Sequence, residues 1–259
     1  MNIAVCVKQI PDPANPYSLD EETHLLVRPE DQVLDDTDRY GVEMGLQMAD
    51  ADEDSTVTLI SMGPSGSMQG IRQALAMGAT NALVITDPAL TGSGALATAR
   101  VLAAAIKRNP FDMVICGTES TDGYSGVVPQ QLAELLEVPA LTYARKVEVA
   151  GGTVKIEQQT VAGYSEVEAP MPVVLTVTAG VVEPRYPTFK GIMAAKSKPV
   201  EELTIADLGI DETTVGTTGS GQETTSVEPA PERTGGTKIE DEGEAHIAIL
   251  EKLQELKVV

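Results

Sequence analysis

The chain has 259 residues, of which 42% are hydrophobic, so it is long and apolar enough for one large α/β domain or two small ones and is not disordered throughout. Thirty-nine acidic residues against 18 basic residues give a net charge of −21. Such a charge repels phosphate backbones and anionic lipids, so we expect no nucleic-acid partner and no binding to a membrane surface. No apolar run approaches the ~20 residues of a transmembrane helix, so we expect no direct membrane insertion.

The two cysteines, Cys6 and Cys116, lie too far apart for a disulfide framework or a metal-binding spacing. Both lie inside apolar segments, which favours buried packing residues over reactive nucleophiles. The first residues form an apolar run without a preceding positive charge, which is typical of a buried strand and not of a signal peptide. We therefore expect a reduced, cytoplasmic protein without a metal site.

Short apolar runs alternate with helical patterns along the first two thirds of the chain. Strands are predicted at residues 3–7, 56–61, 82–86, 112–116 and 173–177, and helices at residues 37–49, 67–77, 93–107 and 126–136. A long excursion with prolines occupies residues 8–36, and a β-hairpin is predicted from strands at 146–149 and 153–160 around a Gly-Gly turn. This alternation predicts a doubly wound, mostly parallel sheet with helices on both faces.

Composition changes sharply near residue 211. Residues 211–236 are rich in Thr and Gly and hold little to bury, which predicts a mobile linker or an extended arm. Residues 244–256 return to a helical pattern, and such a short helix needs a surface to dock on. We therefore divide the chain into an α/β domain (1–183), a loop with a following helix (184–210), a low-complexity linker (211–236) and a C-terminal arm (237–259).

Constellations typical of enzymes are missing from the sequence. The two histidines, His24 and His246, lie in unrelated segments, and no GxSxG elbow is present, so no catalytic residue is predicted. A Gly92-Ser93-Gly94 motif precedes a predicted helix, but five residues separate it from the preceding strand. A dinucleotide fingerprint requires its glycines at the strand end, so a helix start is favoured and an NAD(P) dehydrogenase is disfavoured.

A more promising loop follows the strand at 112–116 directly and leads into a helix. Its small and hydroxyl-bearing residues allow a ligand to approach the backbone, and the N–H groups at a helix N-terminus favour a phosphate. Ligands of open α/β sheets bind beyond the carboxyl ends of the strands, as this loop does. From the pattern alone, adenine-nucleotide binding and an ordinary turn both remain open. The loop comprises Gly117, Thr118, Glu119, Ser120, Thr121, Asp122, Gly123, Tyr124, Ser125, Gly126, Val127 and Val128.

A locally basic segment at residues 183–198 stands out in this acidic chain. It holds four basic residues against one acidic residue, and it contains one of the two phenylalanines. A basic rim around an apolar tip is typical of a docking surface, because charge steers encounter and a buried apolar anchor gives affinity. The alternative is a solvated helix start with its apolar residues in the core. The candidate docking residues are Arg185, Tyr186, Phe189, Lys190, Ile192, Met193, Lys196 and Lys198.

Taken together, these segments resemble the small (β) subunit of electron transfer flavoproteins. The resemblance covers residues 1–210 and, more loosely, the terminal helix. Its most specific part is Glu183-Pro184-Arg185-Tyr186-Pro187-Thr188 followed by the Ile-Met-Ala-Ala-Lys-Ser-Lys run at 192–198. The other matching elements are the Val-Cys-Val-Lys-Gln-Ile-Pro-Asp opening at 5–12, Asp38 with Glu43, Gly63-Pro64, the run at 72–79, and Asp112, Gly117 and Asp122.

The resemblance implies a Rossmann-like fold of the adenine-nucleotide-binding type and a partnership with a larger α subunit that holds most of an FAD. The β subunit of this family usually buries a structural AMP, whereas in electron-bifurcating members a second FAD takes that place. The C-terminal arm embraces the α subunit. The Glu-Pro-Arg-Tyr loop anchors a partner flavoprotein dehydrogenase such as an acyl-CoA dehydrogenase, and its apolar anchor corresponds to Phe189 here.

By position, the resemblance implies that the nucleotide touches Cys6, Asp38, Met62 and the loop at 117–128. This loop departs from the Asp-rich form common among AMP-binding members, which leaves AMP and a second FAD as alternatives. The leading hypothesis is therefore an electron-carrier subunit, with a bifurcating subunit as its runner-up. A nucleotide-binding stress-type protein without a redox role would share the fold but should lack the basic loop and the docking arm.

Overall fold

The computed structural model of the chain describes residues 1–52, 54–64, 66, 68–228, 235–236 and 238–259. The chain forms two compact units, Met1–Glu223 and Thr224–Val259. The second unit holds the terminal helix α7 (Ala245–Glu255), close to the predicted span of 244–256. Part of the predicted linker, at 229–234, and residue 237 of the predicted arm lie outside the described residues.

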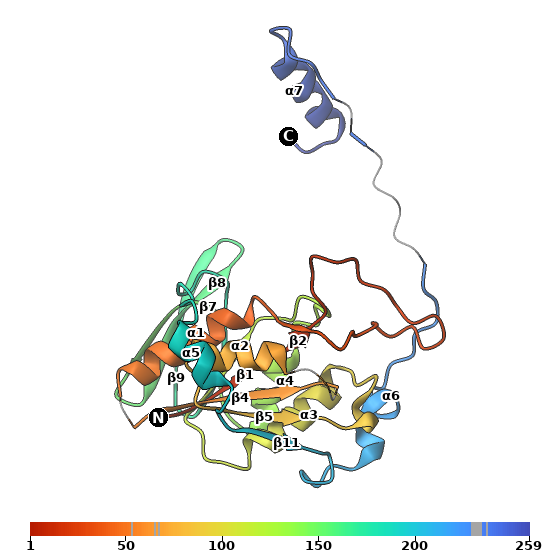
Figure 1. The fold of residues 1–259 in the computed structure, drawn as a ribbon. Helices are drawn as coiled ribbons and strands as arrows, with labels where there is room; N and C mark the ends of the chain where they lie inside the picture. The colour runs from red at the N-terminus through yellow and green to blue at the C-terminus, as the bar shows by residue number, and fades with distance from the viewer. Residues whose placement is uncertain (53, 65, 67, 229–234, 237) are drawn as a thin grey trace. The chain divides into compact units, whose positions relative to one another are not determined.

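A nine-stranded sheet forms the centre of the first unit, in the order β11-β5-β4-β1-β6-β10-β7-β8-β9 (Figure 1). The strands from β11 to β7 pair in parallel, while β8 and β9 extend the sheet with antiparallel pairs. The strand bounds are β1 Asn2–Cys6, β4 Thr56–Met62, β5 Asn81–Ile85, β6 Met113–Gly117, β7 Ala140–Ala150, β8 Thr153–Thr160, β9 Gly163–Pro170, β10 Val173–Val177 and β11 Val200–Leu203. Two short strands, β2 (Gln9–Ile10) and β3 (Val33–Leu34), pair separately within the excursion after β1.

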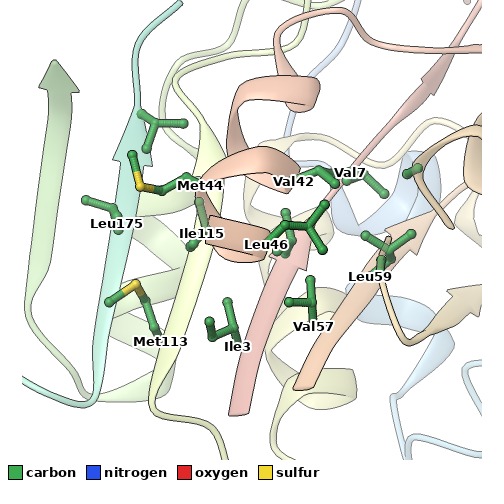
Figure 2. Close-up of a cluster of buried hydrophobic side chains, with 14 of the residues drawn as sticks. Ile3, Val7, Val42, Met44, Leu46, Val57, Leu59, Met113, Ile115 and Leu175 are labelled. Carbon is green, nitrogen blue, oxygen red and sulfur yellow. The ribbon is translucent and has the colours of Figure 1, made fainter. Parts of the chain in front are cut away.

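Helices cover both faces of the sheet, which confirms the predicted doubly wound, Rossmann-like architecture. On one face lie α1 (Asp38–Asp50), α2 (Gln69–Met77) and α5 (Phe189–Ala195), and on the other lie α3 (Ala95–Ile106) and α4 (Val128–Leu136). Successive side chains of β1 point to opposite faces of the sheet. Ile3 therefore belongs to the first core layer, between the sheet and α1, α2 and α5, and Ala4 to the second core layer, between the sheet and α3 and α4. Figure 2 shows the first layer, where Val42 and Leu46 of α1 pack with Ile115 of β6 among its neighbours.

The strand order reverses at the centre of the sheet. The chain runs from β1 through β4 and β5 toward one edge and then returns to place β6 on the other side of β1. The helix after β1, α1, covers one face, and the helix after β6, α4, covers the other. Ligands of open α/β sheets bind at such a switch point, which lies here between the carboxyl ends of β1 and β6.

The sheet is larger than the sequence predicts. Strand β7 begins at Ala140, earlier than the predicted 146, and strands β9 and β11 are not predicted. Residues of β9 are mostly exposed and include two glutamates, so they carry no apolar alternation. Strand β11 is a short Val-Glu-Glu-Leu segment at the opposite edge, with only its last residue buried.

The segment at 211–223 belongs to the first unit and does not form a tether. It contains the turns η2 (Glu212–Thr214) and α6 (Gly216–Gly219), and Val215 is only 1% exposed. The Thr217 amide donates to the Thr91 carbonyl oxygen at 3.1 Å, beside Gly92. Because a side chain at position 92 would collide with Thr217, this glycine serves packing of the chain on itself, in agreement with the disfavoured dinucleotide motif.

Candidate functional site

The predicted nucleotide residues from β1, α1 and β6 converge at the switch point. Cys6 ends β1, and Cys116 with Gly117 ends the neighbouring β6. The adjacent Cys6 thiol and burial both raise the pKa of Cys116 well above its usual value, so this thiol is not a nucleophile. A Cβ atom on Gly117 would lie 3.0 Å from Oδ1 of Asp38, so a larger residue at this position would press on this carboxyl group.

Asp38 is a buried acid at the start of α1. Its Oδ2 accepts a hydrogen bond of 2.6 Å from the Lys8 amide, directly after β1. Burial, and next the charge of Asp35, raise the pKa of Asp38 well above its ordinary value. Burial and a nearby negative charge thus both disfavour the ionised form of this carboxyl group beside the end of β1.

Asp35 ties the predicted nucleotide loop to the segment before α1. Its side chain is inaccessible to solvent, and its Oδ2 accepts hydrogen bonds from the Thr121 amide at 2.7 Å and the Thr121 hydroxyl at 3.1 Å. Its Oδ1 accepts from the amide and hydroxyl of Thr37. Four hydrogen-bond donors, two from Thr37 and two from Thr121, therefore surround this side chain and fix the loop against the start of α1.

Asp122 joins the same loop to the excursion after β1. Its side chain is fully buried, with one oxygen 2.6 Å from Nζ of Lys8 and the other 2.6 Å from Nη2 of Arg28. Burial alone would raise the pKa of Asp122, but the charges of Lys8 and Arg28 hold that pKa below its ordinary value. The two cations share one carboxylate, so the three side chains together carry one positive charge in excess, which favours an anionic ligand near this loop.

Free backbone donors lie further along the loop, at the start of α4. Within the described part of the chain, the amides of Ser125, Gly126, Val127 and Val128 donate to no protein acceptor. The backbone reaches this point through left-handed conformations, with φ of 48° at Tyr124 and 64° at Gly126. Several free N–H groups beside a helix N-terminus suit a phosphate oxygen.

The remaining predicted nucleotide residues are spread around the carboxyl ends of these strands. Met62 ends β4, on the far side of β1 from β6. Ser120 contacts Nζ of Lys8 at 3.3 Å, whereas Glu119, Gly123 and Tyr124 are exposed. Thr118 lines an open hollow of about 550 Å³ together with Tyr143 and other residues beyond the strand ends.

Lys8, Arg28 and Asp35 also belong to this site and were not predicted as site residues. Lys8 directly follows a predicted strand and Asp35 lies two residues before a predicted helix, and these positions are the signal that was available. Their partners lie 86 to 114 residues away along the chain, so no local spacing reveals the pairs.

The predicted docking segment forms the short helix α5, with a bare apolar tip. The hydroxyl of Thr188 caps its start by accepting a hydrogen bond from the Gly191 amide at 3.0 Å. Phe189 is 81% exposed and Tyr186 is 85% exposed, while Ile192 and Met193 are half-exposed. The structure therefore places Phe189 at the surface and not in the core.

The basic residues of this segment fall into two groups. Lys190 and Lys196 are exposed and make no ion pair within the described residues. Arg185 instead binds the buried Glu43 of α1 through Nε at 2.7 Å and Nη2 at 3.0 Å, and its Nη2 also contacts Asp50. Burial would raise the pKa of Glu43, but its bonds with Arg185 hold that pKa below the ordinary value. Lys198 is also engaged inside the chain, at the end of α2.

The terminal helix α7 presents apolar side chains with no fully buried residue. Ile249 and Leu250 are both about half-exposed, at 48% and 50%. Within the described ranges, no helix has both the length and the apolar character to cross a bilayer. Over the same residues, no three His, Cys, Asp or Glu side chains gather as a possible metal site.

A family model described as "Electron transfer flavoprotein domain" matches residues 23–208. The chain belongs to the electron transfer flavoprotein family. It is 38% identical to the electron transfer flavoprotein subunit beta of Mycobacterium tuberculosis, over 100% of this chain and 99% of that protein. It is 36% identical to the subunit beta of Megasphaera elsdenii over the full length of both chains. It is also 29% identical, again over both full lengths, to the caffeyl-CoA reductase-Etf complex subunit CarD of Acetobacterium woodii.

These similarities confirm the predicted resemblance to the β subunit of this family. They assign the chain a role in electron transfer within a family of flavoproteins. A nucleotide-binding protein without a redox role, the alternative from another class, does not agree with this membership.

Proposed function

We propose that the chain is the small subunit of a heterodimeric electron transfer flavoprotein. It pairs with an α subunit that holds most of an FAD, and it carries electrons between flavoprotein dehydrogenases, such as an acyl-CoA dehydrogenase, and an acceptor. The exposed tip of α5 supports this proposal most directly, because a phenylalanine that is 81% exposed is suited to burial against a partner. Electron transfer between flavins requires proximity and no proton-transfer triad from this chain.

Three features support an adenine nucleotide at the switch point. Gly117 leaves room for the Asp38 carboxyl group at the end of β6, the cluster of Lys8, Arg28 and Asp122 has one positive charge in excess, and the free amides at 125–128 offer donors to a phosphate. Bound AMP would contribute structure and no redox chemistry. The residues that would hold it are Cys6, Asp38, Met62 and the loop from Gly117 to Val128.

A second FAD in place of AMP is the alternative, and one observation favours it. The hollow of about 550 Å³ that includes Thr118 and Tyr143 lies beside the nucleotide loop and offers room for a planar ring system. The CarD relative comes from a complex whose name includes a reductase. One FAD could then place its phosphates at the free amides of the loop and its ring system in this hollow, on the β7–β10 side of the sheet.

Co-expression with an α subunit tests the function and separates the two nucleotides. We expect a stable heterodimer whose flavin is reduced by an acyl-CoA dehydrogenase with its acyl-CoA substrate. Denaturing release and chromatography should give one FAD and one AMP per heterodimer, or two FAD for the alternative. Failure of the two chains to copurify, or a heterodimer that the dehydrogenase does not reduce, would overturn the proposed function.

Substitution of Ser125 tests the phosphate end of the site. Ser125→Glu adds a carboxylate beside the free amides, so we expect the released nucleotide to fall well below one equivalent. Ser125→Gln is the matched control, because it adds similar bulk without charge and should retain the nucleotide. Equal nucleotide content in both variants would place the phosphate elsewhere.

A further inference from the structure

Two basic side chains, one on α2 and one just after α5, hold the C-terminal part of α5 against α2. Nη1 of Arg72, on α2, donates to the carbonyl oxygens of Ala195 at 2.7 Å and Lys198 at 2.9 Å, at the end of α5. Nζ of Lys198 donates back to the carbonyl oxygens of Leu75 at 3.0 Å and Ala79 at 2.5 Å, at the end of α2. Each cation thus binds carbonyl groups at the C-terminal end of the other helix, where such groups lack an intrahelical partner and the helix dipole is negative.

The two helices also meet without a side chain between them. A Cβ atom on Gly191 would lie 2.5 Å from the Ala76 carbonyl oxygen, so α5 approaches the last turn of α2 at backbone distance. Ala195, one turn further along α5, is only 3% exposed. Burial lowers the pKa of Lys198, in keeping with an ammonium group withdrawn from solvent.

These contacts determine where the apolar tip points. Helix α5 has seven residues, which is too short for stability without tertiary packing. Its buried side carries Gly191 and Ala195, and its other side exposes Phe189, Ile192 and Met193. An anchor held in its bound orientation loses less conformational freedom on docking than a mobile one.

We propose that Arg72, Gly191 and Lys198 are positioning residues that hold α5 in the orientation required for docking. This inference rests on the proposed function of α5 as the contact with a dehydrogenase. Lys198 then acts through the backbone of α2 and not as a charge presented to the partner. The exposed Lys190 and Lys196 remain the charges that steer encounter.

Two variants and a matched control test this assignment in the heterodimer with its α subunit. Gly191→Ala displaces α5 without a change of charge, and Lys198→Met removes the ammonium group while keeping a long side chain. For each we expect the KM for the heterodimer to rise about tenfold with kcat nearly unchanged, in assays with an acyl-CoA dehydrogenase. Because positioning is not a long-range charge effect, the loss should persist between about 0.05 M and about 0.5 M salt.

Lys196→Met makes the same chemical change two residues earlier, at an exposed site. Its effect on KM should appear at low salt and fade at high salt, because an exposed charge acts through encounter. Hydrogen–deuterium exchange adds a direct readout: amides at 192–195 should exchange faster in Lys198→Met than in Lys196→Met. Unchanged exchange, or a Lys198→Met effect that vanishes at high salt, would overturn the positioning role.

Phe189→Ala separates a failure of this inference from a failure of the proposed function. If Phe189→Ala leaves KM unchanged, α5 is not the docking element and the proposed function of this surface is lost. If Phe189→Ala raises KM but Gly191→Ala and Lys198→Met do not, docking stands and only the positioning role is refuted. Melting curves and flavin content of every variant verify that each heterodimer is folded and loaded.

Discussion

Replacement of Phe189 by alanine should remove docking affinity and leave the fold intact. The side chain is 81% exposed in the free chain, so its loss removes almost no internal packing. Surface substitutions of this kind change the free energy of unfolding by about 0.5 kcal/mol or less. For a unit of this size, the melting temperature then shifts by less than about 2 °C.

The Phe189 side chain would contribute binding free energy when a partner buries it. Full burial of a phenylalanine contributes about 1.5–3 kcal/mol, and every 1.4 kcal/mol corresponds to a tenfold change in affinity. Phe189→Ala should therefore weaken the complex with the dehydrogenase by about 10- to 150-fold. Flavin and nucleotide content should not change, because the residue lies on α5 and not on the loop at 117–128.

Stopped-flow reduction of the heterodimer by an acyl-CoA dehydrogenase, recorded over a range of dehydrogenase concentrations, measures this loss. Leu96→Ala is the matched control, since Leu96 is 41% exposed on α3, which covers the opposite face of the sheet. Normal electron transfer by Phe189→Ala together with a melting temperature lowered by several degrees would refute the reasoning. An equal loss in Leu96→Ala would refute it as well.

Three further predictions concern the supports of the site. Glu43→Gln should lower the free energy of unfolding by about 2 kcal/mol at neutral pH, a value reduced because the partner Arg185 is partly exposed. The pKa of Glu43 is depressed in the folded state. Its contribution to the free energy of unfolding is therefore present above the unfolded pKa of ~4.3 and is lost as pH falls through the folded pKa. Urea unfolding curves of wild type and variant should accordingly converge in acid. Gly117→Ala should reduce nucleotide content by pressing a methyl group on Asp38, and full content with an unchanged melting point would contradict a role of this contact in nucleotide binding. A chain cut after Glu223 should keep the melting temperature of the first unit but form less heterodimer, whereas an unfolded product would show that α7 supports its own domain.

The central part of the fold could be predicted because its signals are local. Strands such as β6 and β10 are buried on both faces and read as continuous apolar runs, and their predicted bounds are correct to one residue. Strands β9 and β11 lie at the edges of the sheet, where water contacts the side chains and no apolar pattern is required. Their pairing depends on what lies beside them in space, and the sequence does not display it.

The same distinction applies to the site. The glycines and hydroxyl groups of the loop at 117–128 are visible in sequence, because a turn after a strand needs small residues nearby. The charge pairs are not visible, because Glu43 and Arg185 lie 142 residues apart, and Asp122 and Arg28 lie 94 apart. A count of charges therefore identifies a basic segment but cannot separate Lys198, which caps α2, from the free Lys196.

Because α5 exposes apolar side chains, the negative net charge of the chain also opposes self-association through this helix. Four apolar side chains that face water would favour self-association of a neutral protein. Two copies of this chain each carry −21, so they repel one another before their tips meet, whereas a partner with a less negative surface is admitted. This selection by repulsion acts over roughly 8–10 Å in moderate salt, and it weakens as salt shortens that range. The net charge of the chain would thus keep copies of this apolar surface apart until the proposed partner covers it.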